Sequence, residues 1–230
     1  MSLSNDEKLT LIKLIEDSKP RYAPLIEEIK GCNIEEFGSL LIKYYADYFS
    51  GELNRSLRNT NVKQPLSLFN YYELLLNKAL DDIESFDNSI VYRMDSCVIE
   101  FEVLKKWYEK RINQIIAVPS FFSTSKYRWP DCPNVFKIKT QKNSKGKNIE
   151  PILSPVKASG EREVLFKSNT FFKIIAIDEH EDTINLEETN SILQEPIFLY
   201  GNTYINDEEI QRCSRARTPL RLSASESGLI

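Results

Sequence analysis

Glycine is scarce in this sequence, which has only seven glycines among 230 residues. None of them forms a G-x-G-x-x-G or G-x-x-x-x-G-K-[ST] pattern, in which glycines let the backbone close around phosphate groups. The sequence therefore excludes the phosphate loops of Rossmann and P-loop proteins. If the protein binds a dinucleotide, side chains and isolated backbone groups must hold the pyrophosphate.

Histidine and paired cysteines are scarce as well. His180 is the single histidine, and it stands in the acidic segment 178–182, which is typical of an exposed turn. Four cysteines are scattered along the chain without a C-x-x-C pair: Cys32, Cys97, Cys132 and Cys213. These absences argue against a zinc cluster and against a Ser-His-Asp triad. We expect no metal site and free thiols, although two disulfides could form in an oxidising compartment.

Long apolar runs and an excess of basic residues are also missing. No stretch approaches the roughly 18 apolar residues of a membrane helix, and segment 1–7 has no basic stretch leading into an apolar one. The formal net charge of -4 gives no electrostatic reason to expect binding to nucleic acid. We expect a soluble protein without a conventional export signal, either cytoplasmic or delivered into another cell.

Apolar residues recur at steps of three and four in the first third of the chain, the spacing of amphipathic helices. Ser4 with Glu7 and Asn33 with Glu36 are plausible capping pairs at the start of two such runs. With a further run after the first strand, the predicted helices cover 9–15, 34–48, 72–83 and 98–112. We predict that the tyrosines and leucines of these stripes, including Tyr48 at the end of the second, pack in the core.

Strand-like segments dominate the remainder of the chain, and turn-rich stretches such as 141–146 separate them. Helices first and strands afterwards predict an α+β fold rather than a doubly wound α/β sheet. The predicted strands are 90–93, 121–125, 135–140, 163–166, 171–177 and 197–200.

Two carboxylates stand two positions apart in the segment 159–164, Ser-Gly-Glu-Arg-Glu-Val. Alternate side chains of an extended segment share one face, so we predict that Glu161 and Glu163 point into the same cleft. One acid could stabilise a cationic transition state while the other steers or deprotonates a nucleophile. An isolated E-x-E pattern is more often a solvated edge, so the neighbouring residues have to decide.

Two other segments carry suitable chemistry. Arg93 ends a predicted strand, and its guanidinium could bind a phosphate through two hydrogen bonds or form a structural ion pair. Ser123 and Ser125 share a face if segment 119–125 is extended, and their hydroxyls could orient a carboxylate of an adjacent strand or cap a turn.

In chain order, Arg93, the Phe-Ser-Thr-Ser segment 122–125 and the Glu-x-Glu segment 161–163 resemble the arginine, serine and glutamate signature of the mono-ADP-ribosyltransferases. The resemblance covers roughly residues 70–178, which are similar to the catalytic region shared by vertebrate-type ecto-enzymes and bacterial toxins of this family. It implies a split antiparallel β-sandwich around an NAD cleft, with an N-terminal helical lobe. The sequence departs from the pattern at Met94, where many relatives carry glycine.

The resemblance also implies roles for individual residues. Glu163 would stabilise the oxocarbenium-like transition state, Ser123 would hold Glu163, and Arg93 would grip the phosphates or the adjoining ribose of NAD. Glu161 would bind and activate a guanidinium, because glutamate at that position goes with arginine acceptors in this family. The implied activity is transfer of ADP-ribose from NAD to arginine side chains of a target protein. The implied NAD contacts are Tyr92, Arg93, Ser123, Thr124, Ser125 and Glu163.

Further expectations concern the loops and the chain's organisation. Residues 152–160 would form a mobile substrate-facing loop, and Tyr127 or Trp129 could stack on nicotinamide or on the acceptor. We expect one domain over residues 1–211, with a helical lobe at 1–86 and a β-rich NAD-binding core at 87–211. A disordered tail is expected at 212–230.

Two alternative functions remain open on the sequence. Water can intercept the cation formed when nicotinamide leaves, so an NAD glycohydrolase would use the same residues. A catalytically silent module with an ADP-ribosyltransferase-like fold could instead use its helical lobe to recruit a partner protein.

Overall fold

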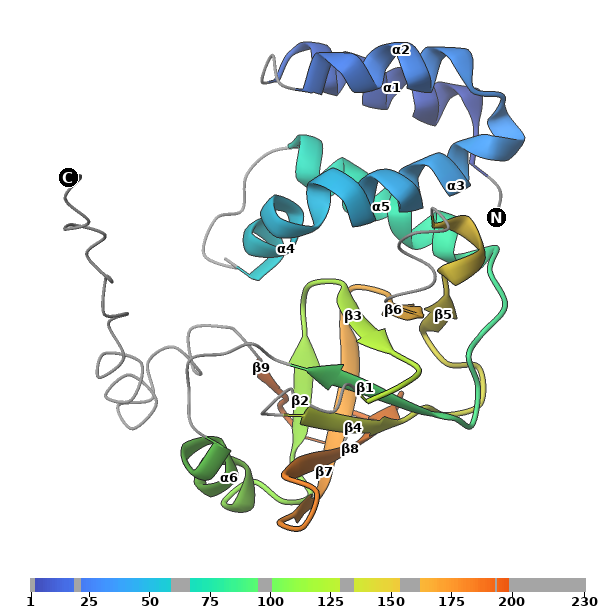
Figure 1. Ribbon diagram of the computed structural model, residues 1–230. Coiled ribbons are helices and arrows are strands. Elements are labelled where there is room, and N and C mark those ends of the chain that lie inside the picture. The colour runs from blue at the N-terminus through green and yellow to red at the C-terminus, as the bar shows by residue number, and fades with distance from the viewer. Residues whose placement is uncertain are drawn as a thin grey trace, which may run out of the picture.

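The computed structural model describes residues 3–18, 22–58, 67–94, 101–128, 135–153, 162–192 and 194–198. A group of helices from the first third of the chain lies against a nine-stranded sheet built from the rest (Figure 1). The predicted α+β class is therefore confirmed. Within the described ranges, no helix is long and apolar enough to cross a membrane.

The predicted helix starts are confirmed by their caps. Ser4 and Glu7 form a reciprocal capping box, and the side chain of Asn33 accepts a hydrogen bond from the backbone N–H of Glu36 at 2.8 Å. Such caps satisfy N–H groups that have no partner within the helix. The helical elements are α1 (Asn5–Glu16), α2 (Ala23–Gly31), α3 (Ile34–Tyr44), the π-helix η2 (Tyr45–Phe49), α4 (Ser50–Arg58), α5 (Leu68–Asp81), α6 (Phe101–Glu109) and the 3-10 helix η3 (Glu150–Ile152).

The π-helix η2 interrupts the predicted helix over 34–48. A π-turn takes more residues than an α-turn, so it rotates the following side chains relative to the apolar stripe. Tyr44 and Tyr45 are buried, whereas Tyr48, which we expected to continue the stripe into the core, is 67% exposed. That prediction is wrong because it extended the α-helical period through η2, and the unpredicted helix α4 follows directly.

The core of the helical part extends into the sheet. Phe37, Leu41 and Leu75 are fully buried at its centre, and the Tyr72 hydroxyl donates a hydrogen bond to the carbonyl of Leu41 at 2.6 Å. Leu165, from the sheet, belongs to the same cluster. One face of the strand that contains Leu165 is therefore packed against the helices.

Nine strands form one sheet in the order β5-β6-β3-β1-β4-β8-β7-β2-β9. The pairs β4–β8 and β2–β9 are parallel, and the other pairs are antiparallel. The strands are β1 (Ile90–Met94), β2 (Ile115–Val118), β3 (Phe122–Ser125), β4 (Val135–Lys139), β5 (Gly146–Asn148), β6 (Glu163–Phe166), β7 (Thr170–Asp178), β8 (Thr183–Thr189) and β9 (Ile197–Phe198). The sequence did not predict β2, β5 and β8.

A second core lies between two parts of this sheet. The rings of Phe122 on β3 and Phe166 on β6 contact Phe172 on β7, with centroid distances of 5.6 and 5.2 Å. The β3–β6 part therefore packs face to face with the part around β7, as in a sandwich. Helix α6 adds Trp107 and Tyr108 to this core and lies apart from the other helices (Figure 1).

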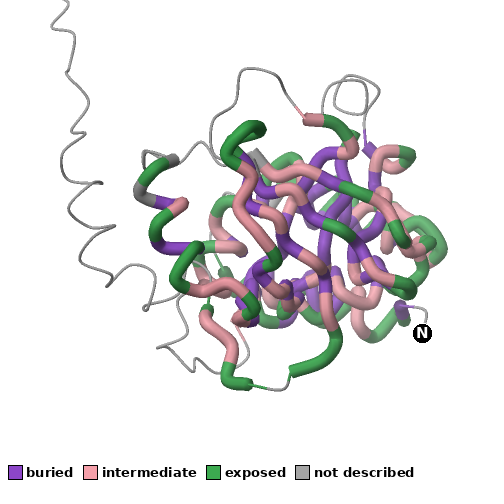
Figure 2. The backbone as a smooth tube through the Cα atoms, turned by 90° about the horizontal axis from the view of Figure 1, so that it is seen from below, coloured by how far each residue is buried: buried purple, intermediate pink, exposed green. Residues whose placement is uncertain are grey.

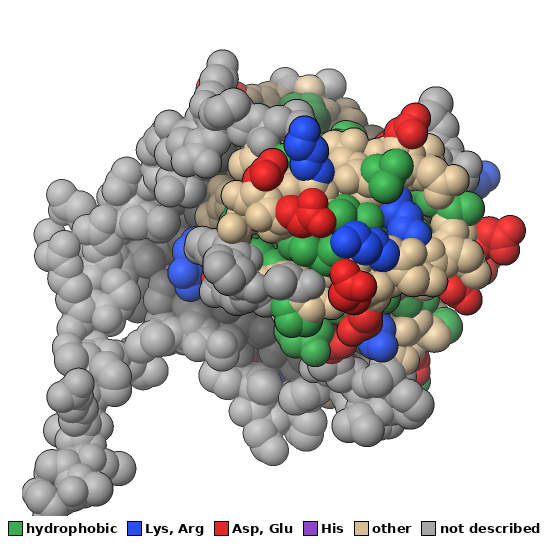
Figure 3. Space-filling model, turned by 90° about the horizontal axis from the view of Figure 1, so that it is seen from above, with side chains coloured by type: hydrophobic (Ala, Val, Ile, Leu, Met, Phe, Trp, Pro, Cys, Tyr) green, Lys and Arg blue, Asp and Glu red, His purple; other side chains and the backbone are tan. Residues whose placement is uncertain are grey.

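The interior and the surface differ as expected for a folded domain. Buried segments run through the middle of the molecule and exposed ones lie at its edge (Figure 2). Acidic and basic side chains are interspersed on the helical face over α1 and α2 (Figure 3).

Candidate active site

The alternation of side chains along β6 decides where Glu163 points. Leu165 belongs to the helical core, whereas Val164 and Phe166 belong to the core within the sheet. Because alternate residues of a strand share a face, Glu163 lies on the same side as Leu165, toward the helices. On the neighbouring strand β3, Ser125 lies opposite Glu163 and Ser123 lies opposite Leu165.

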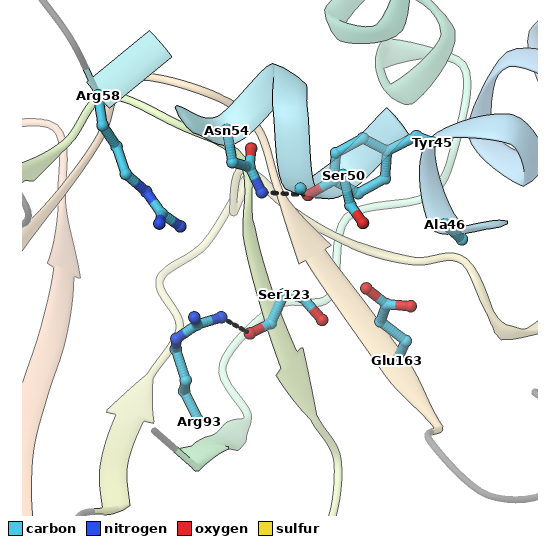
Figure 4. A pocket seen from close by; sticks show the side chains of 9 residues that line it. Tyr45, Ala46, Ser50, Asn54, Arg58, Arg93, Ser123 and Glu163 are labelled. Atoms are coloured by element: carbon cyan, nitrogen blue, oxygen red, sulfur yellow. Dashed lines mark hydrogen bonds between the residues drawn. The ribbon is translucent and has the colours of Figure 1, made fainter. Parts of the chain in front are cut away.

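A cavity of about 340 Å³ lies between this face of the sheet and the helices (Figure 4). The sheet contributes three residues that the sequence singled out, Arg93, Ser123 and Glu163. The volume falls within the range of about 300–1,000 Å³ that is common for small-ligand sites. The helical side of the cavity consists of Tyr45 and Ala46 of η2 and Ser50, Gly51, Asn54 and Arg58 of α4. We call it the Glu163 cavity.

Arg93 is held at the wall of the Glu163 cavity by two contacts. Its Nη1 donates a hydrogen bond to the backbone carbonyl of Ser123 at 2.7 Å. Its Cζ lies 4.5 Å from the centroid of the Phe122 ring, a cation–π geometry. The guanidinium is thus fixed in orientation before any ligand arrives, which lowers the entropic cost of binding an anion.

Glu163 is only 4% exposed although its carboxylate borders a cavity. Water has little access to this carboxylate, so its field acts strongly on any charge that develops nearby. The expected role of the Ser123 hydroxyl in holding Glu163 stays a prediction; both residues border the same cavity.

Tyr45 sits among the charged groups of the site. Its hydroxyl accepts a hydrogen bond from Nδ2 of Asn54 at 2.9 Å. Burial raises the pKa of this phenol well above its usual range; the Glu163 carboxylate adds to the rise, while Arg93 and Arg58 oppose it. Tyr45 therefore keeps its proton at neutral pH and can donate a hydrogen bond into the cavity.

Arg58 is a second cation of the Glu163 cavity, and the sequence did not point to it. Its Nε donates a hydrogen bond to the Ser120 hydroxyl at 3.3 Å. Asn54 and Arg58 stand four residues apart on α4, so they share a face of the helix. That spacing is the signal that could have found them, but it is visible only once α4 is recognised as a helix beyond η2.

Three other residues named as NAD contacts are not among the described residues that line the cavity. Thr124 is buried and donates a hydrogen bond to the carbonyl of Val164 at 2.7 Å. Ser125 accepts one from the backbone N–H of Tyr127 at 3.2 Å, and the half-buried Tyr92 pairs with Ser125 across β1 and β3.

The geometry before β6 differs from the expected extended segment. Glu161 lies outside the described residues, but Arg162 has a φ of 43°, in the left-handed region. The premise that placed Glu161 and Glu163 on one face of an extended segment is therefore wrong at Arg162. The backbone N–H of Lys126 donates a hydrogen bond to the carbonyl of Arg162 at 3.1 Å, which stabilises this turn.

Tyr127, proposed to stack on nicotinamide or the acceptor, contacts the guanidinium of Arg162 in this structure. The Cζ of Arg162 lies 4.4 Å from the centroid of its ring, although Tyr127 remains 54% exposed. Trp129, the other proposed stacking residue, lies outside the described residues. The stack therefore ties Tyr127 to the turn that separates Glu161 from Glu163.

The remaining predictions concern the loop 152–160, the tail 212–230, the cysteines and metal binding. Ile152 ends the 3-10 helix η3, and Leu153 is buried in the helical core, so the first two residues of the predicted loop 152–160 are packed. The rest of that loop and the tail 212–230 lie outside the described residues. Cys32 is a half-buried free thiol. Among the residues that the structure places, no group of three His, Cys, Asp or Glu side chains could hold a metal ion.

A family model described as ADP-ribosyltransferase exoenzyme matches residues 36–199 of this chain. This range contains β1, β3, β6 and the helical segment η2–α4, and hence every residue that lines the Glu163 cavity. In a search of curated proteins, no sequence matches.

Solved structures show the same fold at low sequence identity. The type III effector XopAI from Xanthomonas axonopodis pv. citri is 15% identical, with 82% of this chain and 89% of that chain covered and a TM-score of 0.56. The toxin Plx2a from Paenibacillus larvae is 18% identical over 80% of this chain and 97% of that one, with a TM-score of 0.55. Vis from Vibrio splendidus, solved with agmatine, is 17% identical over 87% and 95%, with a TM-score of 0.53.

Proposed function

The chain belongs to the ADP-ribosyltransferase exoenzyme family, whose members use NAD as substrate, and on that premise we propose that it ADP-ribosylates arginine side chains of a target protein. The observation that carries the proposal is the position of the buried Glu163 carboxylate in one cavity with Arg93 and Arg58. This arrangement offers one anion for a sugar cation and two cations for a pyrophosphate.

Glu163 is assigned to the bond that breaks. When the bond between C1′ of the ribose and the pyridinium nitrogen breaks, its electron pair neutralises the pyridinium and nicotinamide leaves. The ribose is left with an oxocarbenium-like positive charge. A carboxylate fixed beside that carbon stabilises the developing charge without having to reorganise. The leaving group is already activated, so the protein supplies position and charge.

Arg93 and Arg58 are assigned to the pyrophosphate. A guanidinium stays charged at any physiological pH and can donate two parallel hydrogen bonds to phosphate oxygens. Asn54 and the protonated Tyr45 add neutral donors on the same side of the cavity. These side chains replace the glycine-rich loop that the sequence lacks.

Glu161 is assigned to the acceptor. A carboxylate pairs with a guanidinium through two hydrogen bonds and can take up the proton that the nitrogen loses as it attacks C1′. The similarity to Vis, which has been solved with agmatine, supports a guanidinium acceptor because agmatine ends in that group. The toxin and effector neighbours lead us to place the target protein in a cell other than the producing one.

The proposal is tested with purified protein, NAD labelled in its adenylate half and a mixed protein extract. We expect nicotinamide release and label on protein, with mass spectrometry locating the ADP-ribose on arginine. Label on another residue type would support the transferase activity but contradict arginine as the acceptor residue. Nicotinamide release without protein label would indicate a glycohydrolase. If the protein neither turned over nor bound NAD, the catalytically silent interaction module would be the remaining alternative.

Arg58→Ala is expected to weaken NAD binding by about 10- to 100-fold, the usual effect of losing a hydrogen bond to a charged group. Isothermal titration calorimetry with NAD measures the change. Arg55→Ala is the matched control, because Arg55 lies on the same helix but is exposed and does not line the Glu163 cavity. Equal affinities for Arg58→Ala and Arg55→Ala would remove Arg58 from the binding site.

A further inference from the structure

A second cavity, of about 380 Å³, opens between helix α2 and the segment from α3 to α4. Three tyrosines and two glutamates dominate its lining: Tyr22, Tyr44, Tyr48, Glu28 and Glu52. We call it the tyrosine cavity. Nothing in the proposed transferase reaction uses it.

The rings of the tyrosine cavity are held by their neighbours. Tyr22 stacks on Phe49 with a centroid distance of 4.9 Å, and its hydroxyl donates a hydrogen bond to the Glu52 carboxylate. The rings of Tyr44 and Tyr48 lie 5.9 Å apart at an angle of 49°. The cavity thus has aromatic walls that are positioned before a ligand binds.

Tyr44 brings a buried hydroxyl to the wall of the cavity. The residue is only 3% exposed, and its phenol interacts with the Glu28 carboxylate. Burial raises the pKa of this phenol, and the Glu28 carboxylate raises it further. Tyr44 therefore stays uncharged at neutral pH, and the negative charge of the cavity comes from its carboxylates.

The π-helix η2 is the reason that Tyr48 reaches this cavity. It turns Tyr48 away from the core, and the side chain stands 67% exposed at the rim instead of packing with the buried Tyr45. An exposed aromatic ring above a carboxylate-bearing cavity costs the fold little and offers its face to a ligand.

We propose that the tyrosine cavity binds an organic cation, an alkylguanidinium or alkylammonium group. Aromatic faces attract such cations, and the Glu28 and Glu52 carboxylates supply the opposite charge. Leu25, which is buried beside the rings, provides an apolar surface for an alkyl stem. Charges of both signs mix on the helical face in Figure 3, so the cavity's own rings and carboxylates must provide the selectivity.

The tyrosine cavity is distinct from the Glu163 cavity. Both are lined by the segment from α3 to α4, but by different residues: Tyr44, Tyr48 and Glu52 in one case, and Tyr45, Ala46, Ser50, Gly51, Asn54 and Arg58 in the other. The inference therefore does not depend on the proposed transferase activity, and the two can fail separately.

The test titrates n-butylguanidinium into the full chain by calorimetry. Glu28→Gln and Tyr48→Ala are expected to weaken binding by about five- to thirtyfold each, as the loss of a charge or of a cation–π contact implies. Both residues are exposed, so the variants should keep the wild-type circular dichroism spectrum and melting temperature. Glu27→Gln is the matched control, because Glu27 is the neighbouring exposed glutamate on α2, does not line the tyrosine cavity and lies 3.5 Å from Nζ of Lys30.

Two further arms identify the source and the site. A capped pentapeptide with a central arginine, bound at least as tightly as the free cation, would identify a protein side chain as the ligand; binding of the free cation alone would identify a small molecule. Glu161 is itself assigned to a guanidinium acceptor, so Glu161→Gln is expected to remove at most that separate site and to keep the binding that depends on Glu28. Loss of the Glu28-dependent binding in Glu161→Gln, equal binding in Glu28→Gln and wild type, or no binding at millimolar concentration would each overturn the proposal.

Discussion

Glu163→Gln is expected to lower the rate of nicotinamide release by about 10²- to 10³-fold, the usual effect of removing one preorganised electrostatic contact to a transition state. Glutamine has the shape of glutamate and can still form hydrogen bonds, but it cannot neutralise a sugar cation. Because Glu163 is 4% exposed and borders the Glu163 cavity, water cannot readily take over this role.

The measurement is steady-state nicotinamide release with and without a protein acceptor, and both rates should fall together. NAD affinity should change far less than the rate, since the carboxylate acts on charge that exists only in the transition state. Glu187→Gln, which removes an exposed carboxylate paired with Lys139 on the sheet, should keep wild-type rates. If Glu163→Gln lowered the rate of nicotinamide release by less than tenfold, a group other than Glu163 would have to stabilise the sugar cation.

Glu161→Gln is expected to separate the two halves of the reaction. Transfer to arginine should fall by about 100-fold or more, because general-base assistance to the attacking nitrogen contributes at least that much in comparable reactions. Slow hydrolysis of NAD should persist, since water needs no guanidinium-binding carboxylate and Glu163 remains in place.

Transfer to agmatine and hydrolysis are followed side by side in Glu161→Gln and the wild type. A parallel loss of both activities would show that Glu161 acts on the glycosidic bond or on the fold, and would contradict an acceptor role. Full transfer in the variant would exclude arginine recognition by this residue.

The helical stripes and the strand signals of the sequence predict the class of fold because they depend on local spacing. The capping pairs at Ser4 and Asn33 formed as predicted, since a cap involves residues only three positions apart. β6 begins and ends as predicted because Glu163–Phe166 is a short apolar strand between turns. The sandwich-like packing of Phe122 and Phe166 on Phe172 arises only when distant strands meet.

The features that the sequence did not predict depend on backbone geometry or on contacts between distant parts of the chain. An α-helical period continued through η2 predicts Tyr48 in the core, but backbone hydrogen bonding changes in η2 and the apolar stripe rotates. Arg58 was overlooked because α4 is short, and its role depends on the sheet that it faces. The φ of 43° at Arg162 is imposed by a turn tied to Lys126 and Tyr127, which a two-residue alternation cannot reveal.

The sequence by itself determined the chemistry available to this protein. It carries arginine, serine and paired glutamates in the order of a mono-ADP-ribosyltransferase, without a glycine-rich phosphate loop, because residue type and local spacing are properties of the chain. Only the tertiary structure decided which of those groups meet. Arg93, Ser123 and Glu163 are separated by 30 and 40 residues, and pairing of β1 and β6 with β3 brings them to one cavity, which α4 closes with Arg58.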